Sequence, residues 1–132
     1  MLDDLEGAER WLEDWESSIA ERAAKAKTFA EQGAAVSATA TDPGGVVEVT
    51  VDSSGVVTGL QLRERVRRMP APELGDLILS VMRAAQANLA HRMARVAADT
   101  MGEDNDMTRT IAASYERRFP TAASEEDGSY GR

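Results

Sequence analysis

Side chains suited to acid–base or metal chemistry are few in this sequence of 132 residues. The one histidine is His91, and the absence of cysteine excludes disulfides, thiolate zinc sites and a cysteine nucleophile. A single histidine lacks the further histidine or cysteine ligands of a transition-metal site, and we expect it on the polar side of a helix. The sequence therefore predicts a protein that is not an enzyme, with no cofactor, no metal and no small-molecule substrate.

The acidic stretch at residues 103–106 is a second candidate for ligand binding. Counted from Asp104, a calcium loop needs glycine at its sixth position and glutamate at its twelfth, where this chain has Arg109 and Tyr115. The pair Gly44-Gly45 likewise lacks the lysine and the spacing of a phosphate-binding loop. We interpret the acidic stretch as a solvated helix end and linker.

Arginine is the residue type whose distribution suggests a binding function. Residues 63–95 contain seven arginines and three acids, a net charge of +4 in a chain whose total is −8. No aromatic side chain lies among them to stack on bases, so we expect contacts to the phosphate backbone of DNA with weak sequence preference. The candidate DNA-binding residues are Arg63, Arg65, Arg67, Arg68, Arg92 and Arg95. The alternative is that these arginines pair with the acidic first helix of a second subunit.

A long helix is predicted over residues 3–32, ending at Gly33. Leu5, Leu12 and Ile19 recur every seven residues, and this is typical of a helix with one apolar stripe. At 1.5 Å per residue such a helix is about 45 Å long. Its first half is strongly acidic, with eight acids and one base between residues 3 and 21.

Three antiparallel strands are predicted next, because apolar and polar residues alternate over residues 35–62 with turn signals at residues 42–45 and 53–55. Pro70 and Pro72 then break the chain, and helical spacing continues to about Met101 before Gly102. The predicted fold class is α+β, a helix, a three-stranded antiparallel sheet and a helix (α-β-β-β-α), forming one domain over residues 1–102. Residues 103–132 are expected to be an acidic polar tail with a possible short helix at 107–119 and a disordered end.

The first helix is too long for the small sheet to cover, so part of it is expected to project. Water would not leave its apolar stripe bare, because burying each large side chain contributes about 1.5–3 kcal/mol. We therefore expect a homodimer formed through twofold pairing, the alternative being a monomer in which the two long helices fold back on each other. The candidate residues for the dimer or partner interface are Leu5, Trp11, Leu12, Trp15 and Ile19.

A valine-rich segment at residues 45–51 is followed by Ser-Ser-Gly-Val-Val-Thr-Gly-Leu-Gln-Leu at residues 53–62, and then by a proline-broken loop and a long alanine-containing helix. With these segments the sequence resembles, over about residues 3–100, the YbaB/EbfC family of small bacterial nucleoid-associated proteins. The resemblance implies a helix–three strands–helix fold and tweezer-shaped dimers that bind DNA with little sequence specificity.

Two features depart from the family pattern. Family DNA binding is attributed to the terminal helices, whereas the first helix here is acidic, and the tail after Gly102 is longer than in short members. The arrangement is closer to actinobacterial relatives, some associated with type VII secretion loci. The leading hypothesis is a dimeric nucleoid-associated protein that binds DNA through its backbone. The alternative is a protein-interaction scaffold or adaptor that does not bind DNA, for which the resemblance to these relatives suggests an association with type VII secretion.

The expected location is the cytoplasm, at the nucleoid. The N-terminal residues are acidic and lack the apolar run of a secretory signal, and no stretch approaches the roughly 20 apolar residues of a membrane helix. We therefore expect no membrane partner.

Overall fold

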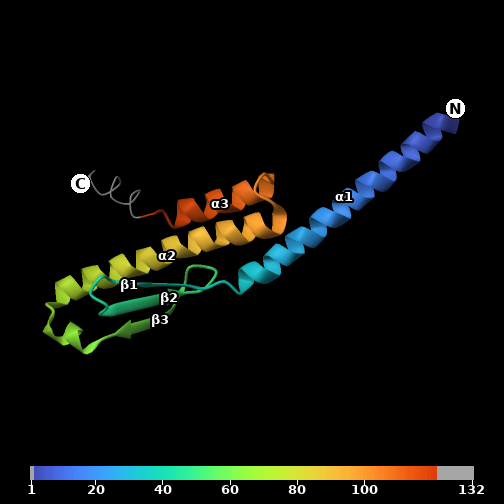
Figure 1. Ribbon diagram of the computed structural model, residues 1–132. Helices are drawn as coiled ribbons and strands as arrows, with labels where there is room; N and C mark the ends of the chain where they lie inside the picture. Colours follow the sequence, from blue (N-terminus) through green and yellow to red (C-terminus); the bar gives the residue numbers. More distant parts are fainter. Residues whose placement is uncertain (1, 122–132) are drawn as a thin grey trace, which may run out of the picture.

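The computed structural model describes residues 2–121, and the side chains of residues 4–121. A long helix precedes a three-stranded sheet and a second long helix (Figure 1). The elements in chain order are α1 (Leu2–Ala34), β1 (Ala38–Thr41), β2 (Val47–Val51), β3 (Val57–Leu62), the 3-10 helix η1 (Glu64–Arg68), α2 (Ala71–Met101) and α3 (Asp106–Arg118). The predicted α+β fold and its helix–three strands–helix order are confirmed.

The sheet is an antiparallel meander in the order β1-β2-β3. Ala38 pairs with Val51 across β1 and β2, and Val47 pairs with Leu62 across β2 and β3. An irregularity in the register lies between Thr50 and Val51, close to the β2–β3 turn. Each strand is short, and the sheet is therefore a small platform beside the long helices.

The core lies between α2 and two of the three strands. Val47, Val49 and Val51 of β2 are at most 1 % exposed and face the buried residues Val81 and Leu89 of α2. Leu60 and Leu62 of β3 are 48 % and 45 % exposed, although they pair with Val49 and Val47 and so point to the same face of the sheet. Helix α2 therefore covers β1 and β2 and leaves the apolar face of β3 uncovered.

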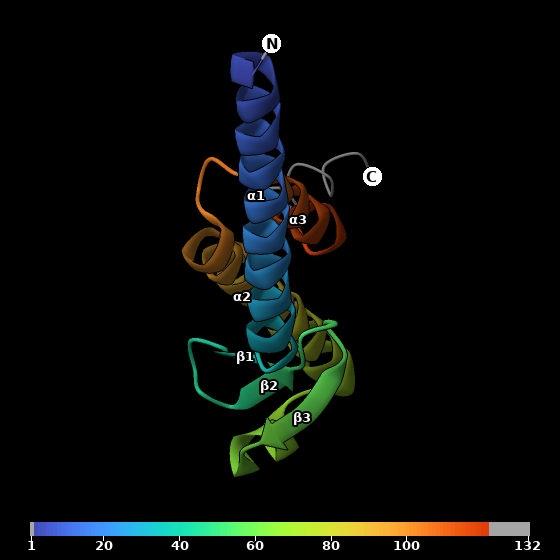
Figure 2. The same ribbon diagram turned by 90° about the vertical axis from the view of Figure 1, so that its right-hand side faces the viewer.

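Helix α1 has 33 residues, which corresponds to about 50 Å. Only its C-terminal part lies against the rest of the molecule, and its N-terminal part projects away from the sheet and from α2 (Figures 1 and 2). The helix continues one residue past Gly33, so the prediction that Gly33 ends it was wrong. Gly33 is buried, and a Cβ atom there would lie only 3.0 Å from the terminal methyl group of Met93 on α2. This glycine permits close packing of α1 on α2 instead of ending the helix.

Helix α3 runs back along α2 and occupies part of the region after Gly102 (Figure 1). The Thr108 hydroxyl group, buried at 6 % exposure, lies 2.7 Å from the Gly102 carbonyl oxygen and donates a hydrogen bond to it. At the other end, the Tyr115 hydroxyl donates to the Ser53 carbonyl in the β2–β3 turn at 2.9 Å. Helix α3 is therefore held to both α2 and the hairpin. The disordered end expected for the tail lies mostly at residues 122–132, outside the described residues.

Candidate nucleic-acid interface

Four of the six candidate arginines lie on one short segment between β3 and α2. The Arg63 backbone N–H donates to the Val46 carbonyl at 2.9 Å and fixes the start of this segment at the edge of the sheet. Val66 and Met69, three residues apart, turn inward and pack against the core, as the period of a 3-10 helix requires. The remaining positions face solvent, and they carry Arg63, Arg65, Arg67 and Arg68. We call these four residues the arginine cluster.

The four guanidinium groups differ in their contacts. Arg65 donates to the Gly44 carbonyl at 3.3 Å, so its side chain is held beside the β1–β2 turn. Arg67 forms an exposed ion pair with Glu64 at 3.2 Å, which screens part of its charge. Within residues 4–121, Arg63 and Arg68 have no ion-pair partner in the structure. These two arginines are therefore the ones whose charge is fully available to a ligand.

Arg65 and Arg68 also border a cavity of about 450 Å³ between the β1–β2 turn and the start of α2. Asp42 lies in its wall, and its carboxylate accepts hydrogen bonds from the backbone N–H groups of Val47, Val46 and Gly44 at 2.7, 2.8 and 3.0 Å. The hydrogen bond from Val47 is the main cause that holds the pKa of Asp42 below its ordinary value; desolvation opposes it, and the bonds from Val46 and Gly44 add to it. Asp42 therefore organises the turn against which Arg65 rests, and it places one negative charge beside the arginine cluster.

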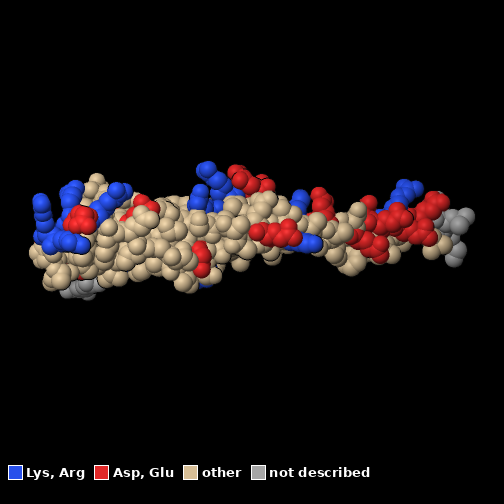
Figure 3. All heavy atoms as spheres, turned by 90° about the horizontal axis from the view of Figure 1, so that it is seen from below, with Lys and Arg blue, Asp and Glu red and all other residues tan. Residues whose placement is uncertain are grey.

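Arg92 and Arg95 lie apart from the arginine cluster. From Ala71 at the start of α2, Arg92 is about 30 Å further along the helix axis. Both residues border a cavity of about 380 Å³ at the junction of α1 and β1, and Arg92 donates a hydrogen bond to the Ser37 carbonyl there. In Figure 3, basic side chains gather at the end of the molecule opposite the projecting part of α1, and a second group lies nearer the middle. The six candidates thus form two groups and not one continuous site.

A comparison with known protein families decides the assignment. The model of the YbaB/EbfC DNA-binding family matches residues 12–104. The chain belongs to this family. YbaB/EbfC proteins are nucleoid-associated DNA-binding proteins, and the family is not an enzyme family. No curated protein and no solved structure matches the chain.

The YbaB/EbfC match ends before α3 begins, and it begins after the first residues of α1. The apolar residues of α1 predicted as an interface include Leu5, Trp11 and Trp15, which are 62 %, 66 % and 50 % exposed. Leu12 and Ile19 are exposed as well. All five lie in the projecting part of α1 or directly next to that part, where no other described element covers them.

A second exposed apolar surface was missed by the sequence analysis. Val57, Leu60 and Leu62 of β3 and Leu79 of α2 are all more than 40 % exposed. We call these four residues the β3 patch. The alternating pattern of β3 predicts an apolar face, but it does not predict that α2 lies over the other two strands. No signal in the sequence distinguishes a covered strand from an uncovered one.

The residues considered for catalysis or metal binding are either exposed or take part in helix capping. His91 is exposed on α2, between Asn88 and Arg92. Asn105 begins α3, because its side chain accepts a hydrogen bond from the Met107 N–H at 2.7 Å. In the described part of the chain, no three histidine, aspartate or glutamate side chains gather as metal ligands do. Nor is any described helix both long and apolar enough to cross a membrane.

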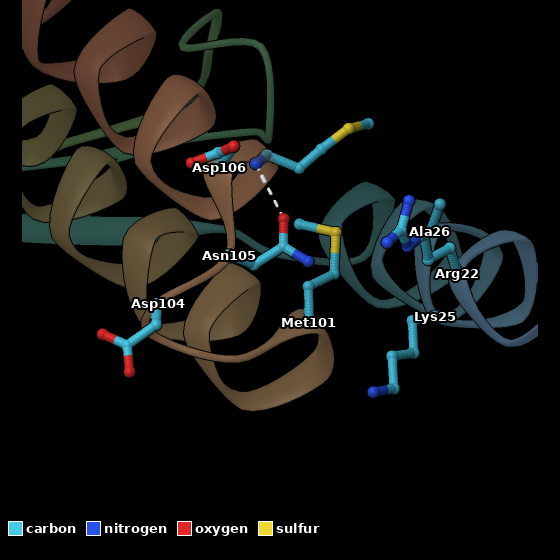
Figure 4. A pocket seen from close by; sticks show the side chains of 8 residues that line it. Arg22, Lys25, Ala26, Met101, Asp104, Asn105 and Asp106 are labelled. Carbon is cyan, nitrogen blue, oxygen red and sulfur yellow. Dashed lines mark hydrogen bonds between the residues drawn. The ribbon is translucent and has the colours of Figure 1, made fainter. Parts of the chain in front are cut away.

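A cavity of about 430 Å³ separates α1 from the α2–α3 connection (Figure 4). Its basic lining residues, Arg22 and Lys25, come from α1, and its acidic ones, Asp104 and Asp106, come from the connection. The acidic stretch thus faces a basic part of α1 and begins a helix. This arrangement explains the carboxylates without a bound cation.

Proposed function

We propose that this YbaB/EbfC protein is a homodimer that binds duplex DNA at the nucleoid through phosphate contacts, with little preference for sequence. The observation that carries the proposal is the arginine cluster in a chain of a DNA-binding family: four exposed arginines on one short segment, two of them, Arg63 and Arg68, without an ion pair or a side-chain hydrogen bond among residues 4–121. Guanidinium groups bind phosphate oxygens through paired N–H donors. The cytoplasmic, nucleoid location follows from this role.

Phosphate binding explains the chemistry of the arginine cluster better than base recognition does. The segment that carries the cluster is a 3-10 helix of five residues, which is shorter than the recognition helices that enter a major groove. No aromatic side chain lies within it to stack on a base. Contacts of this kind give binding that weakens steeply with salt and depends little on sequence.

The spacing of the two arginine groups also suits a duplex. The start of α2 lies next to the arginine cluster, and Arg92 and Arg95 lie about 30 Å further along this helix. One turn of B-DNA is about 34 Å long. A duplex lying along this side of the molecule would present the same backbone to both groups, one turn apart. The first half of helix α1, which projects from the molecule, is acidic and would be repelled by phosphates. We therefore assign this half of the helix no contact with DNA.

The dimer is proposed to form through the β3 patch. Four large apolar side chains, three on β3 and one on α2, stay exposed in one subunit, and a twofold axis beside β3 would bury them against their equivalents. Each dimer would then carry two arginine clusters. Two clusters raise the affinity for one duplex, because the second contact becomes intramolecular.

A titration of a fluorescent duplex tests the DNA contacts. We expect binding at micromolar protein in about 50 mM salt and a steep loss of affinity as salt rises. Replacing Arg63 and Arg68 by alanine should lower the affinity at least about tenfold and reduce the slope of log K against log salt by about 2 per subunit engaged. The control variant, Arg10→Ala/Arg109→Ala, removes the same charge from two exposed arginines that are already paired with Glu6 and Asp106.

Two outcomes would reject the proposal. The first is the absence of binding at micromolar protein in about 50 mM salt, where phosphate-driven affinity is high. The second is an equal loss in the control variant, because this would mean that only total charge matters.

A further inference from the structure

The projecting part of α1 carries both tryptophans of the chain on an uncovered surface. Trp11 and Trp15 lie one turn apart, with ring centroids 6.4 Å apart and planes 14° from parallel. Leu5, Leu12 and Ile19 continue the same stripe and are 44–62 % exposed. In Figures 1 and 2 this part of the helix stands clear of the sheet, α2 and α3. A stripe of this length, about 24 Å over residues 4–19, matches a helix of a binding partner.

The flanks of this stripe identify the chemistry of that partner. In a heptad numbering with Leu5, Leu12 and Ile19 at position a, Glu9 and Glu16 take position e, beside the seam. Asp4 takes position g, on the other side of the seam. Residues 4–19 contain six acids and one base, Arg10, which faces away from the seam at position f. The apolar stripe is thus bordered by carboxylates.

A second copy of α1 is a poor occupant for this seam. In a parallel pair, Asp4 would face Glu9 of the other copy, and in an antiparallel pair the e positions, Glu9 and Glu16, would face each other. Like charges opposite each other destabilise such pairs, and the summed acidic field adds to the repulsion. Of the other basic residues of α1, Arg22 and Lys25 border the cavity opposite Asp104 and Asp106, and Lys27 takes the outer position b, so none of them flanks the first half of the seam.

We infer that the first half of α1 is a docking surface for a basic amphipathic helix of another protein, with an apolar seam and lysine or arginine at its flanking positions. Trp11, Trp15 and Leu12 supply the apolar contacts, and Glu9 and Glu16 select the charge of the partner. The surface is separate from the arginine cluster, which lies at the other end of the molecule (Figure 3). DNA and a basic protein helix therefore bind at different places and do not compete for the same residues.

Tryptophan fluorescence of the full chain tests this inference directly, because both tryptophans lie in the proposed surface. The probe is a synthetic three-heptad helix without aromatic residues, with leucine at a and d and lysine at e and g. We expect a saturable blue shift of the emission with this peptide at low salt, and weaker binding as salt rises. A matched peptide with glutamate at e and g should produce no shift.

Two charge variants separate a specific seam from a general attraction. Glu9→Lys/Glu16→Lys should weaken binding of the lysine peptide at least about tenfold and permit binding of the glutamate peptide. Glu13→Lys/Asp14→Lys makes the same change of charge at the outer positions b and c, and it should leave the lysine peptide within about threefold of its wild-type affinity. Equal losses in the two variants would overturn the inference.

The dilution behaviour of the free protein is the second decisive measurement. Under this inference the tryptophan emission stays red-shifted, as for exposed indoles, at every protein concentration. Emission that is blue-shifted at high concentration and moves to the red as the protein dissociates would mean that a second copy covers the stripe. That result would overturn the inference and leave the proposed DNA binding untouched.

Discussion

At the scale of single residues, Asp42 links the stability of the sheet to the arginine cluster. Its carboxylate accepts three backbone N–H groups in the β1–β2 turn, and these bonds favour the charged form, so its pKa in the folded protein is lowered. The unfolded chain has the ordinary pKa. The ionised carboxylate therefore stabilises the fold at pH values above the ordinary pKa, and this stabilisation is lost as the pH falls through the lowered value.

Asp42→Asn should lower the melting temperature at pH 7, because the amide has one acceptor oxygen and turns an N–H₂ group toward the backbone donors. The gap between the variant and the wild type should begin to shrink as the pH falls below about 4, where the carboxyl of the unfolded chain takes up a proton, and should close as the pH falls through the lowered pKa of the folded protein. Circular dichroism melts between about pH 2.5 and about pH 7 measure both effects. Asp76→Asn, an exposed substitution on α2, is the control. A gap that stays constant with pH would contradict the role given to the charge of Asp42.

The arginine cluster shows what a sequence predicts about individual residues. Charge counting along the chain located Arg63, Arg65, Arg67 and Arg68, and all four are exposed. It did not predict that Arg67 pairs with Glu64. Nor did it predict that Arg92, about 30 Å along α2 from the start of that helix, bonds to the Ser37 carbonyl. The bond of Arg92 depends on where the backbone of another element passes, and this information is absent from local composition.

At the scale of elements, the β2–β3 turn and the end of α3 fit each other through Gly55. This residue has φ of +85°, which disfavours side chains, and a methyl group on it would overlap the Phe119 ring. Gln86 of α2 also donates to the Gly55 carbonyl at 3.0 Å. The β2–β3 turn, α2 and the end of α3 therefore meet at Gly55.

Gly55→Ala is expected to destabilise the protein and to release the end of α3. The matched control is Gly45→Ala, since Gly45 has φ of +71° but open space around its Cα. Both substitutions impose backbone strain of about 1–2 kcal/mol on the folded state, and only the first displaces Phe119. Hydrogen exchange of the amides in α3 should accelerate in Gly55→Ala and remain unchanged in Gly45→Ala. The same exchange rates in both variants would show that α3 does not depend on this contact.

The spacing of apolar residues predicted the helices and strands well, because it shows which face of each element is buried. The alternation of β2, with Val47, Val49 and Val51 inward, and the spacing of α2 both appear in the core. Periodicity failed at Gly33, which a sequence rule assigns to a helix end and which serves a close contact with Met93. It failed at β3 also, because the pattern of a strand does not state which helix lies over it.

At the scale of the whole molecule, charge and apolar surface are separated along its length. The projecting part of α1 is acidic and the opposite end is basic (Figure 3), and β3, which carries three residues of the β3 patch, leads into the segment of the arginine cluster (Figure 1). A dimer through the β3 patch would keep both acidic arms and both arginine clusters accessible. A dimer through the first half of α1 would instead bring the two acidic segments together, which costs electrostatic free energy.

Leu62→Lys therefore should convert the proposed dimer to monomers without unfolding the subunit, because Leu62 is 45 % exposed in the isolated chain. A twofold interface loses this leucine twice, which is about 3 kcal/mol or more and corresponds to an increase of at least about 100-fold in the dimer dissociation constant. Light scattering across a dilution series measures this constant, and circular dichroism reports the fold. Gln61→Lys is the matched control, since Gln61 pairs with Glu48 on the other face of the same strand.

The same pair of variants connects assembly to function. Leu62→Lys leaves every arginine in place, so a dimer that engages one duplex with two arginine clusters predicts a lower apparent DNA affinity for this variant alone. The added lysine increases the positive charge, and charge alone would raise the affinity for DNA. A fall in affinity can thus be ascribed to the loss of the second subunit. If the wild-type chain is already monomeric at all dilutions, or if Leu62→Lys binds DNA as tightly as Gln61→Lys, the β3 patch is not the dimer interface through which DNA is bound.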